Sequence, residues 1–558
     1  MRPLTRASRD LSHKGRGDFL NTTETPSPPV GEGRGEGLLV RICHPGLWAL
    51  IGIALTFHST WAHADSLVEF AKAGDTAAAI ASIKRGADVN AAEPDHTTAL
   101  HYAAHRGDAK LVEQLLRARA KANAVNDYGS TPLGEAAAIG SAPVIKLLLK
   151  AGADANLPNP EGQTALMAVA RTGHVEAAKL LLKHGADVNA KEHWGGQSAL
   201  MWAAAQSQPD MVKLLIAHGA DVNARGAVRD WQRRSTAEPR PKGMNRGGFT
   251  PLLYAAREGC VQCAKYLVEG KANIDLTDPE RTTPLVLALL NLHFDLAAYL
   301  ISAGADIDKW DFSGRTPLYV AIDMNTLPHG GRPDLPSVDD TTPLQVAELL
   351  LKAGANPNIQ LKLRPPYRNY IFDRGRDEVL STGATPLLRA ARASDIEAVR
   401  LLLKYHARVD IANASGVTPL MAAAGMNYGD NPTRGAFKTD TQTAETVRLL
   451  KEAGGNVNAQ AHDGETALHS AAAHGWNETI KVLVADGAEL EPTDKRGLRP
   501  IDYAVGRQER QFLAKEANRH ADTIALLTDF ITARTGRKPL EFNGTFADRQ
   551  KGPPEGGL

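Results

Sequence analysis

The chain has 558 residues, of which 43% are hydrophobic, and its 64 Lys and Arg side chains almost balance 63 Asp and Glu side chains, giving a formal net charge of +1. Residues 1–64 carry seven basic and five acidic residues, so the remainder has a net charge of −1. A balance this close to neutral argues against a general nucleic-acid-binding protein, whose binding face carries an excess of Lys and Arg.

The N-terminal 64 residues divide into two segments. Residues 1–40 are rich in Gly, Arg, Pro and Thr without apolar periodicity, so we expect disorder there. Residues 41–64 resemble a signal peptide, with a basic start, an apolar run Leu47–Phe57 and the cleavage pattern Ala62-His63-Ala64. The apolar run is short for a membrane span. Because signal peptides stand at the N-terminus, we hypothesise that translation begins near residues 38–41; the alternative is an uncleaved signal anchor.

A repeated tripeptide, Thr-Pro-Leu or Thr-Ala-Leu, organises residues 65–531. It recurs every 33 residues wherever nothing is inserted, with Thr at 98, 131, 164, 250, 283, 316, 385, 418 and 466 and Ser198 replacing Thr once. A fixed period of this length is typical of stacked supersecondary units. One further period at each end gives degenerate units starting at Asp65 and Arg499, so we expect about twelve units.

The unit at residues 164–196 illustrates the predicted local structure. Thr164 precedes an apolar run and can cap a short helix that ends at Gly173. In many sister units Pro follows this Thr, at the first helical position. A second helix starts near Val175, places Leu181 on its apolar face, and ends before Gly185, which can adopt the left-handed conformation. Neither helix can bury its apolar face alone, so neighbouring units must stack.

Four insertions interrupt the period, near residues 225–248, 327–340, 360–383 and 427–441. Insertions in repeat arrays form surface loops, often on a binding face. The first is strongly basic around Trp231, and the third mixes Arg with Tyr and Phe. Such segments could bind an acidic partner, a phosphate backbone or an anionic membrane surface. The alternative is a solvated loop with incidental charge.

The end of the chain contains a charged stretch, RQERQFLAKEANRH, followed by a predicted final helix at Thr523–Ile531. Residues 532–558, which end in KGPPEGGL, have a composition typical of a disordered tail.

The repeated pattern TPLxxAAxxGxxxxxxLLLxxGADVN resembles the ankyrin repeat, and the resemblance covers roughly residues 65–530. His101 and His469 keep the His that this family has after Leu, whereas several other units carry a different residue there. The resemblance implies an all-α solenoid of about twelve helix-turn-helix units joined by short β-hairpins. It further implies a binding surface on the concave side, formed by the hairpin tips and the exposed face of the first helices.

Aromatic and Arg side chains at these positions are the candidate partner-binding residues, because exposed Trp, Tyr and Arg commonly supply binding energy. They lie at hairpin tips (Tyr128, Trp194, Trp310, Phe312), on first helices (Tyr102, Trp202, Tyr254, Arg257, Arg389) and in the first insertion (Trp231). The alternative for Trp202 and Tyr254 is that both are half-buried against the next unit.

Cys260 and Cys263 form a C-x-x-C pattern at the start of a second helix and are the only cysteines after residue 64. In an oxidising compartment such a pair can close as a disulfide. Because no thioredoxin-like strand pattern surrounds the pair, we expect a structural staple rather than a redox site. Residue 264 is Ala, so the haem-attachment pattern C-x-x-C-H is absent.

Known catalytic and nucleotide-binding motifs are absent from the sequence, including the P-loop, H-E-x-x-H, G-x-S-x-G and the dinucleotide glycine fingerprint. We therefore expect no catalytic residue, cofactor or metal. The resemblance and the leader together predict an exported bacterial scaffold, periplasmic or secreted, monomeric and without a stable membrane span after signal cleavage, that binds another protein and no specific nucleic acid. Two alternatives are a redox or enzymatic protein that uses Cys260 and Cys263 or an inserted loop, and a secreted effector that acts on a host protein.

Overall fold

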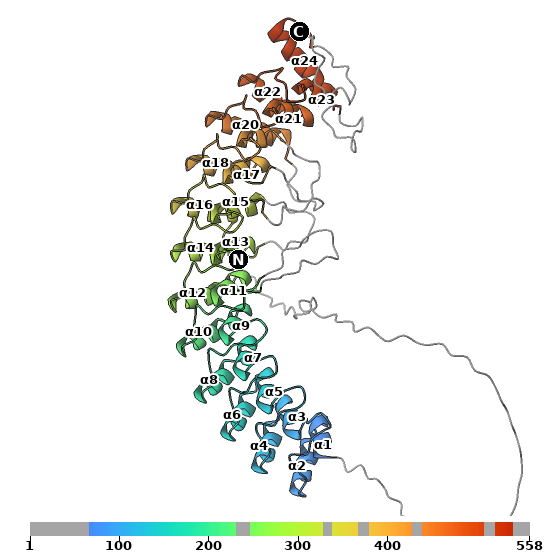
Figure 1. The fold of residues 1–558 in the computed structure, drawn as a ribbon, viewed down its shortest axis with the longest axis vertical. Helices are drawn as coiled ribbons and strands as arrows, with labels where there is room; N and C mark the ends of the chain where they lie inside the picture. The colour runs from blue at the N-terminus through green and yellow to red at the C-terminus, as the bar shows by residue number, and fades with distance from the viewer. Residues whose placement is uncertain are drawn as a thin grey trace, which may run out of the picture. The chain divides into compact units, whose positions relative to one another are not determined.

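The computed structural model describes residues 66–229, 246–326, 337–365, 379–426, 438–506 and 519–539. These ranges contain helices α1 to α24 and no β-strand. Consecutive helices pair into twelve units (Figure 1). The first helix of each unit, here the inner helix, packs on the inner helices of the neighbouring units, and the second, outer helices also stack. The predicted all-α solenoid of twelve units is confirmed.

The inner helices carry odd numbers: α1 Leu67–Ala73, α3 Ala99–His105, α5 Pro132–Ala138, α7 Ala165–Thr172, α9 Ala199–Ala205, α11 Pro251–Glu258, α13 Pro284–Leu290, α15 Pro317–Thr326, α17 Pro386–Ala393, α19 Pro419–Ala423, α21 Ala467–His474 and α23 Pro500–Ala504. The outer helices carry even numbers: α2 Thr76–Lys84, α4 Ala109–Arg117, α6 Ala142–Lys150, α8 Val175–Lys183, α10 Pro209–Ala217, α12 Val261–Glu269, α14 Phe294–Ser302, α16 Pro343–Lys352, α18 Ile396–Lys404, α20 Asp440–Glu452, α22 Asn477–Ala485 and α24 Ala521–Thr535.

The repeated Thr marks where the inner helices begin. The hydroxyl of Thr131 accepts a hydrogen bond from the backbone N–H of Gly134 at 3.0 Å, and Pro132 opens the helix. Thr164 caps α7 in the same way, and Gly173 ends that helix with φ 77°. Because a capped first turn satisfies an otherwise unpaired N–H, a cap of this kind contributes about 1 kcal/mol to stability.

A continuous apolar core runs between the two helix layers. Inner helices contribute small residues such as Ala103 and Ala137, both fully buried, which allow neighbouring inner helices to approach closely. Outer helices contribute large ones such as Leu115 and Leu148, also fully buried. Each unit therefore completes its core only with its neighbours.

Two sets of hydrogen bonds join successive units outside the core. In the first, an Asn side chain bridges to the next unit: Asn123 accepts from the N–H of Asp154 at 2.8 Å and donates to the carbonyl of Gly152 at 3.0 Å. The second joins the loops between units, as when the N–H of His193 donates to the carbonyl of Glu161 at 2.8 Å. The predicted β-hairpins are tight turns linked by such bonds, with isolated bridges only, at Ala92–Thr98 and Val228–Gly247, in the described residues.

The predicted end of the final helix is wrong by four residues. Helix α24 continues to Thr535 rather than ending at Ile531, and Gly536 caps it with φ 73°. The hydroxyls of Thr532 and Thr535 donate to carbonyls of their own helix at 2.7 Å, which satisfies them inside the extra turn.

Several predicted segments lie outside the described residues. These are the disordered segment 1–40, the signal peptide 41–64, the central parts of the four insertions with Trp231, and the tail beyond residue 539. They stay predictions.

Candidate partner-binding surface

The loops between units 4 and 9 each project a cationic or aromatic side chain. We call these side chains the tip row: Trp194, Arg229, Arg281, Trp310, Phe312 and Lys362. Trp194 is 74% exposed and Phe312 63%, which is unusual for large hydrophobic side chains. Gln197, in the same loop as Trp194, donates a side-chain hydrogen bond to the Tyr254 hydroxyl on α11, which links this loop to an inner helix.

A buried carboxylate holds the turn that carries Trp194. Glu192 is only 5% exposed and accepts hydrogen bonds from the N–H groups of Trp194, Gly195 and Gln197 at 2.6 to 2.9 Å. Arg229, from the next loop, donates to the Trp194 carbonyl and places its guanidinium carbon 4.0 Å from the ring centroid. The indole is thus exposed while its backbone is fixed.

Trp310 lies on a turn built in the same manner. Its neighbour Asp311 is buried and accepts from the N–H groups of Ser313 and Arg315 at 2.9 Å, and it also pairs with the Arg315 side chain at 2.6 Å. The Trp310 ring has two cations nearby, with Arg281 at 5.4 Å and Lys362 at 5.8 Å from its centroid. Cation–π contacts at such exposed positions contribute about 0.5–1 kcal/mol each.

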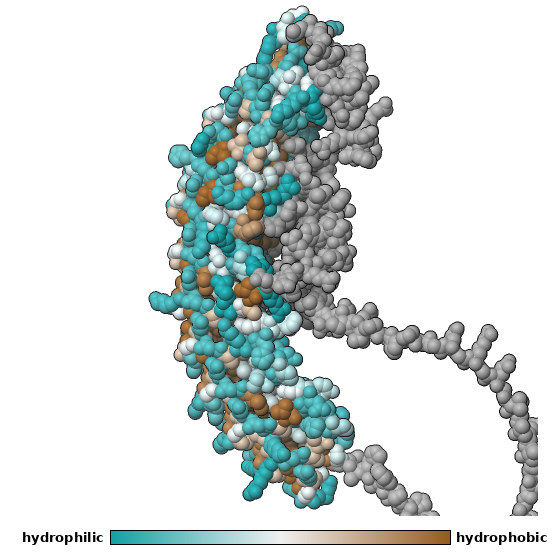
Figure 2. Space-filling model, in the orientation of Figure 1, coloured by the Kyte–Doolittle hydropathy of each residue, from teal (hydrophilic) through white to brown (hydrophobic). Residues whose placement is uncertain are grey.

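Two surface hollows accompany these tryptophans. One of about 240 Å³ is lined by Trp194, Arg229 and Phe249, among others. Another of about 500 Å³ is lined by residues that include Arg281, Asp308 and Trp310. Each hollow combines an indole ring with a guanidinium group. On the face drawn in Figure 2, apolar residues are scattered among hydrophilic ones.

The candidates on the inner helices are less accessible than the tip row. Tyr102 is half-buried, and its hydroxyl donates to Glu93, which also pairs with Lys72 at 2.6 Å. Trp202 is half-buried, and its indole Nε1 has no hydrogen-bond partner among the residues that the structure describes. Tyr254 is buried to 9% exposure, and burial raises the pKa of its hydroxyl. The alternative interpretation, that Trp202 and Tyr254 pack against neighbouring units, matches their burial.

The expectation that Arg389 contributes to an exposed binding face is wrong. Arg389 on α17 is only 3% exposed and forms an ion pair with Asp323 of α15, whose side chain is fully buried. The pair joins two neighbouring inner helices, so the guanidinium group is unavailable to a partner. Arg257 remains accessible, pairs with Glu258 at 2.7 Å and lies 5.1 Å from the Tyr254 ring centroid.

Tyr128 is 73% exposed but lies apart from the tip row, on the loop between units 2 and 3. The loops of units 1 to 4 carry acidic residues instead, with Asp95, Asp127 and Glu161 among them. His96 pairs with Asp127 at 2.6 Å in this acidic stretch. The tips of these early loops are therefore acidic, whereas the loops of the tip row combine aromatic and cationic side chains with carboxylates such as Glu280 and Asp306.

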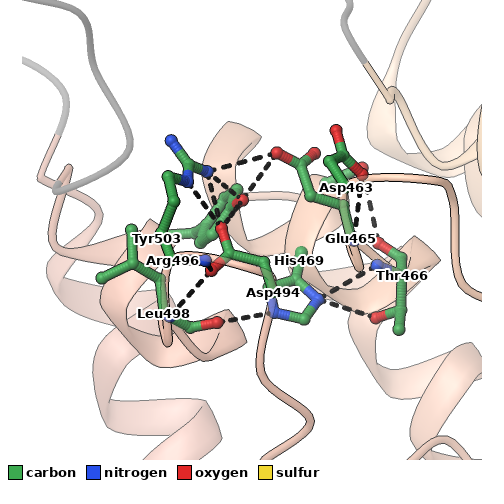
Figure 3. Close-up of polar contacts among 9 residues, drawn as sticks. Asp463, Glu465, Thr466, His469, Asp494, Arg496, Leu498 and Tyr503 are labelled. Carbon is green, nitrogen blue, oxygen red and sulfur yellow. Dashed lines mark hydrogen bonds and ion pairs between the residues drawn. The ribbon is translucent and has the colours of Figure 1, made fainter. Parts of the chain in front are cut away.

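The loops before and after unit 11 hold a polar cluster of a different kind (Figure 3). Arg496 pairs with Asp494 at 2.7 Å and with Glu465 at 3.3 Å, and the Tyr503 hydroxyl lies 2.6 Å from Glu465. Burial raises the pKa values of Glu465 and Tyr503. These groups form ion pairs and hydrogen bonds with one another across neighbouring units, so we interpret the cluster as a structural link between the units.

His469 completes the link between units 11 and 12. Its Nδ1 accepts from the Thr466 N–H at 3.1 Å, so its Nε2 donates to the Leu498 carbonyl at 3.0 Å (Figure 3). Burial lowers the pKa of this imidazole, which favours the neutral form. His101 makes the equivalent contacts with Thr98 and Ser130.

Cys260 and Cys263 form a disulfide at the start of α12, with Cα atoms 5.3 Å apart. Cys260 is also the helix cap, because its Sγ accepts from the Cys263 N–H at 3.2 Å, and Cys263 is fully buried. In the described ranges, no three His, Cys, Asp or Glu side chains are grouped so as to hold a metal ion. No helix within those ranges is both long and apolar enough to cross a membrane.

Sequence reasoning missed Arg281, and it considered Lys362 only as part of the third insertion. Both lie in loops whose tips become adjacent only when the units stack. An alignment of the loops of consecutive units on their repeated Thr would have drawn attention to these cations. Arg281, for example, directly precedes the Thr-Thr-Pro of its unit.

The family model for ankyrin repeats (three copies) matches residues 67–159, 133–226, 252–361, 342–431 and 436–540. B-cell lymphoma 3 protein homolog of mouse is 31% identical over 140 residues, 25% of this chain and 28% of that protein. Ankyrin repeat domain-containing protein 63 of mouse is 32% identical over 125 residues, 22% of this chain and 29% of that protein. The chain thus spans less than a third of the length of these relatives. The crystal structure of the human ASB11 ankyrin repeat domain is 27% identical and aligns with 40% of this chain and 90% of that one at a TM-score of 0.33.

Proposed function

Because the chain belongs to the ankyrin repeat family, we propose that it is an exported, non-enzymatic scaffold that binds a protein partner through the tip row and the adjoining inner helices. Ankyrin repeats are protein–protein interaction scaffolds and are generally non-enzymatic. The partner and the concave-face location are our proposal.

The exposure of Trp194, Trp310 and Phe312 on rigid turns carries this proposal. Large aromatic side chains gain binding energy when a partner covers them. Glu192 and Asp311 hold the two turns through buried hydrogen bonds, so little conformational entropy is lost on binding. A preformed, aromatic and basic surface of this kind suits recognition of another protein.

A capture experiment tests the binding function. The intact chain and a Trp194→Ala/Trp310→Ala/Phe312→Ala variant are used as bait in an extract of the source cells, and captured proteins are quantified. We expect at least one partner to be retained by the intact chain and lost with the variant. Leu349→Ala, on outer helix α16 and 39% exposed, is the matched control. Equal capture by the intact chain and the triple variant contradicts the proposal.

Export is supported by two independent features. The leader has the order of a signal peptide, and the Cys260–Cys263 disulfide suits an oxidising compartment. Protease accessibility in spheroplasts, compared with the amount in culture supernatant, separates periplasmic retention from release. Release into the medium favours the effector alternative, and protection of the protein inside spheroplasts contradicts export.

A further inference from the structure

The disulfide at the start of α12 joins two sulfur atoms in different surroundings. Cys260 is half-buried at the turn between α11 and α12, whereas Cys263 is fully buried in the core. The sequence pattern favoured a structural staple, but closing a loop of only four residues contributes about 2 kcal/mol, against about 3 kcal/mol for a loop of about 15 residues. Stability is therefore a weak reason for this disulfide, and of its two sulfurs the one on Cys260 is the more accessible to an incoming thiol.

The position of Cys260 holds a negative charge in other units of the array. Asp75, Asp108 and Asp395 are the equivalent N-caps of α2, α4 and α18, and each carboxylate accepts a hydrogen bond from the third N–H of its helix at 2.9 to 3.0 Å. The Sγ of Cys260 accepts the same bond from the N–H of Cys263 at 3.2 Å. Because the N–H groups and the dipole at a helix N-terminus stabilise anions, this position favours the thiolate form of a reduced Cys260.

The neighbouring side chains are compatible with a thiolate at this turn. Glu258 pairs with Arg257 at 2.7 Å, which offsets its repulsion of a negative charge on Cys260. The imidazole of His293, from the next unit, donates from Nε2 to the Arg257 carbonyl at 3.0 Å. Its ring packs on Gly259, where an added Cβ would lie 2.4 Å from Nδ1. An imidazole, rather than a carboxylate, thus covers the residue that precedes Cys260.

We propose that Cys260 and Cys263 form a thiol–disulfide exchange site that oxidises a pair of thiols on another protein. A partner thiolate attacks Sγ of Cys260, the bond between Cys260 and Cys263 breaks, a mixed disulfide forms, and the sulfur of Cys263 leaves and takes up a proton. The second partner thiolate then attacks the partner sulfur of the mixed disulfide, and Cys260 leaves as a thiolate. The partner loses two electrons and two protons. The cysteine pair gains both electrons and one proton, and the other proton goes to solvent.

This inference goes beyond the proposed scaffold function and does not depend on the tip row. The resting state is the closed disulfide, so one chain oxidises one pair of thiols. Helix α11 begins after the loop that carries Arg229 and ends just before Cys260. Its eight residues, at about 1.5 Å each, separate the two ends by about 12 Å. Failure of the capture experiment would therefore leave the exchange site untouched.

The reactivity of single cysteines tests the predicted thiolate. Chains that carry Cys43→Ser with either Cys263→Ser or Cys260→Ser react with glutathione disulfide at about pH 6.5, and mass spectrometry measures the mixed disulfide. The control is Glu269→Cys in a chain whose three native cysteines are replaced by Ser. Residue 269 is exposed at the last position of α12, where the helix dipole opposes a thiolate.

We expect Cys260 to react about fivefold faster than the cysteine of the Glu269→Cys chain, although Cys260 is less exposed. The buried Cys263 should be the slowest of the three. Equal rates at residues 260 and 269, or a faster reaction at residue 269, would overturn the proposal, because exposure alone would then govern the reaction.

Exchange by the folded pair distinguishes this site from a staple. The oxidised Cys43→Ser chain is mixed with an excess of a reduced peptide that contains two Cys residues, and alkylation with mass spectrometry follows both. We expect one peptide disulfide for each chain reduced, while circular dichroism stays that of the folded chain. The chain that also carries Cys260→Ser/Cys263→Ser should form none. A disulfide that opens only when urea unfolds the chain would contradict the proposal.

Discussion

Individual residues show where sequence information is sufficient and where it is not. The cap at Thr164 and the turn at Gly173 were predicted because both depend on the local chain. The burial of Arg389 was not, because its partner Asp323 lies 66 positions away and meets it only when units 8 and 9 stack. For the same reason, the contacts of Arg281 and Lys362 with the Trp310 ring were not predicted, because the three residues lie in three different loops.

The buried pair gives a prediction for stability. Replacing Arg389 by Met removes one partner of a buried ion pair, and we expect a loss of about 3–5 kcal/mol in the free energy of unfolding. Adding Asp323→Leu should recover part of that loss. Arg257→Met, at an exposed ion pair, is the control and should cost about 0–1 kcal/mol. Urea unfolding measures all three, and equal losses at Arg389 and Arg257 would contradict the buried pair.

The buried imidazole of His469 gives a prediction for pH dependence. An unfolded His titrates near pH 6.5, whereas burial lowers the pKa of His469 in the folded chain. Below about pH 6.5 the unfolded state therefore binds more protons, and stability falls by up to about 1.4 kcal/mol per pH unit. Thermal unfolding of the intact chain and His469→Gln between pH 8 and 5 should show a smaller pH dependence for the variant. Parallel curves would refute this role.

At the scale of elements, the repeated tripeptide located the inner helices to within a residue: α3, α5 and α7 begin directly after Thr98, Thr131 and Thr164. The end of α24 was misplaced because Thr has a modest helix propensity. Sequence reasoning could not foresee that the Thr532 and Thr535 hydroxyls would bond to their own helix.

Removing a helix cap measures how much the capping hydrogen bond contributes to the free energy of unfolding. Thr131→Ala removes the acceptor for the Gly134 N–H, and we expect a loss of about 1 kcal/mol. Thr172→Ala, where an exposed hydroxyl bonds only within its helix, should change stability less. Urea midpoints of the two variants make the comparison, and an inverted order would be inconsistent with capping.

The disulfide at the start of α12 gives a second prediction at this scale. It closes a loop of only four residues, so its loss through Cys260→Ser/Cys263→Ser should cost about 2 kcal/mol. Thiol titration of a Cys43→Ser chain should detect no free thiol before reduction. A persistently reactive Cys260 would instead favour the redox alternative. Thermal unfolding with and without reductant provides the stability measurement.

At the scale of the whole array, the period predicted twelve units, but it did not predict which side chains the tips expose. Those side chains belong to loop residues outside the repeated pattern, such as Asp127 in an early loop and Lys362 in a later one. A repeat pattern specifies the core contacts that every unit shares, whereas the exposed tip residues are free to differ.

Stability should be local along such an array, because each unit contacts only its neighbours. Leu115→Ala, in the core of unit 2, should cost about 2–5 kcal/mol. Amide hydrogen exchange should then show lost protection in units 1 to 3, while units 10 to 12 exchange as before. Uniform loss of protection over all units would instead indicate a single cooperative block.

The described residues on either side of the first insertion, 225–229 and 246–248, suggest a site for inserting foreign sequence. The N–H of Arg229 donates to the Arg246 carbonyl at 2.7 Å, and Ala227 donates to the carbonyl of Gly195 in the preceding loop at 2.7 Å. The two chain segments on either side of the insertion are thus joined to each other and to the preceding loop by backbone hydrogen bonds. We therefore expect that a foreign sequence, such as an epitope or a fluorescent reporter, can be grafted between residues 229 and 246 with the flanking helices left in register.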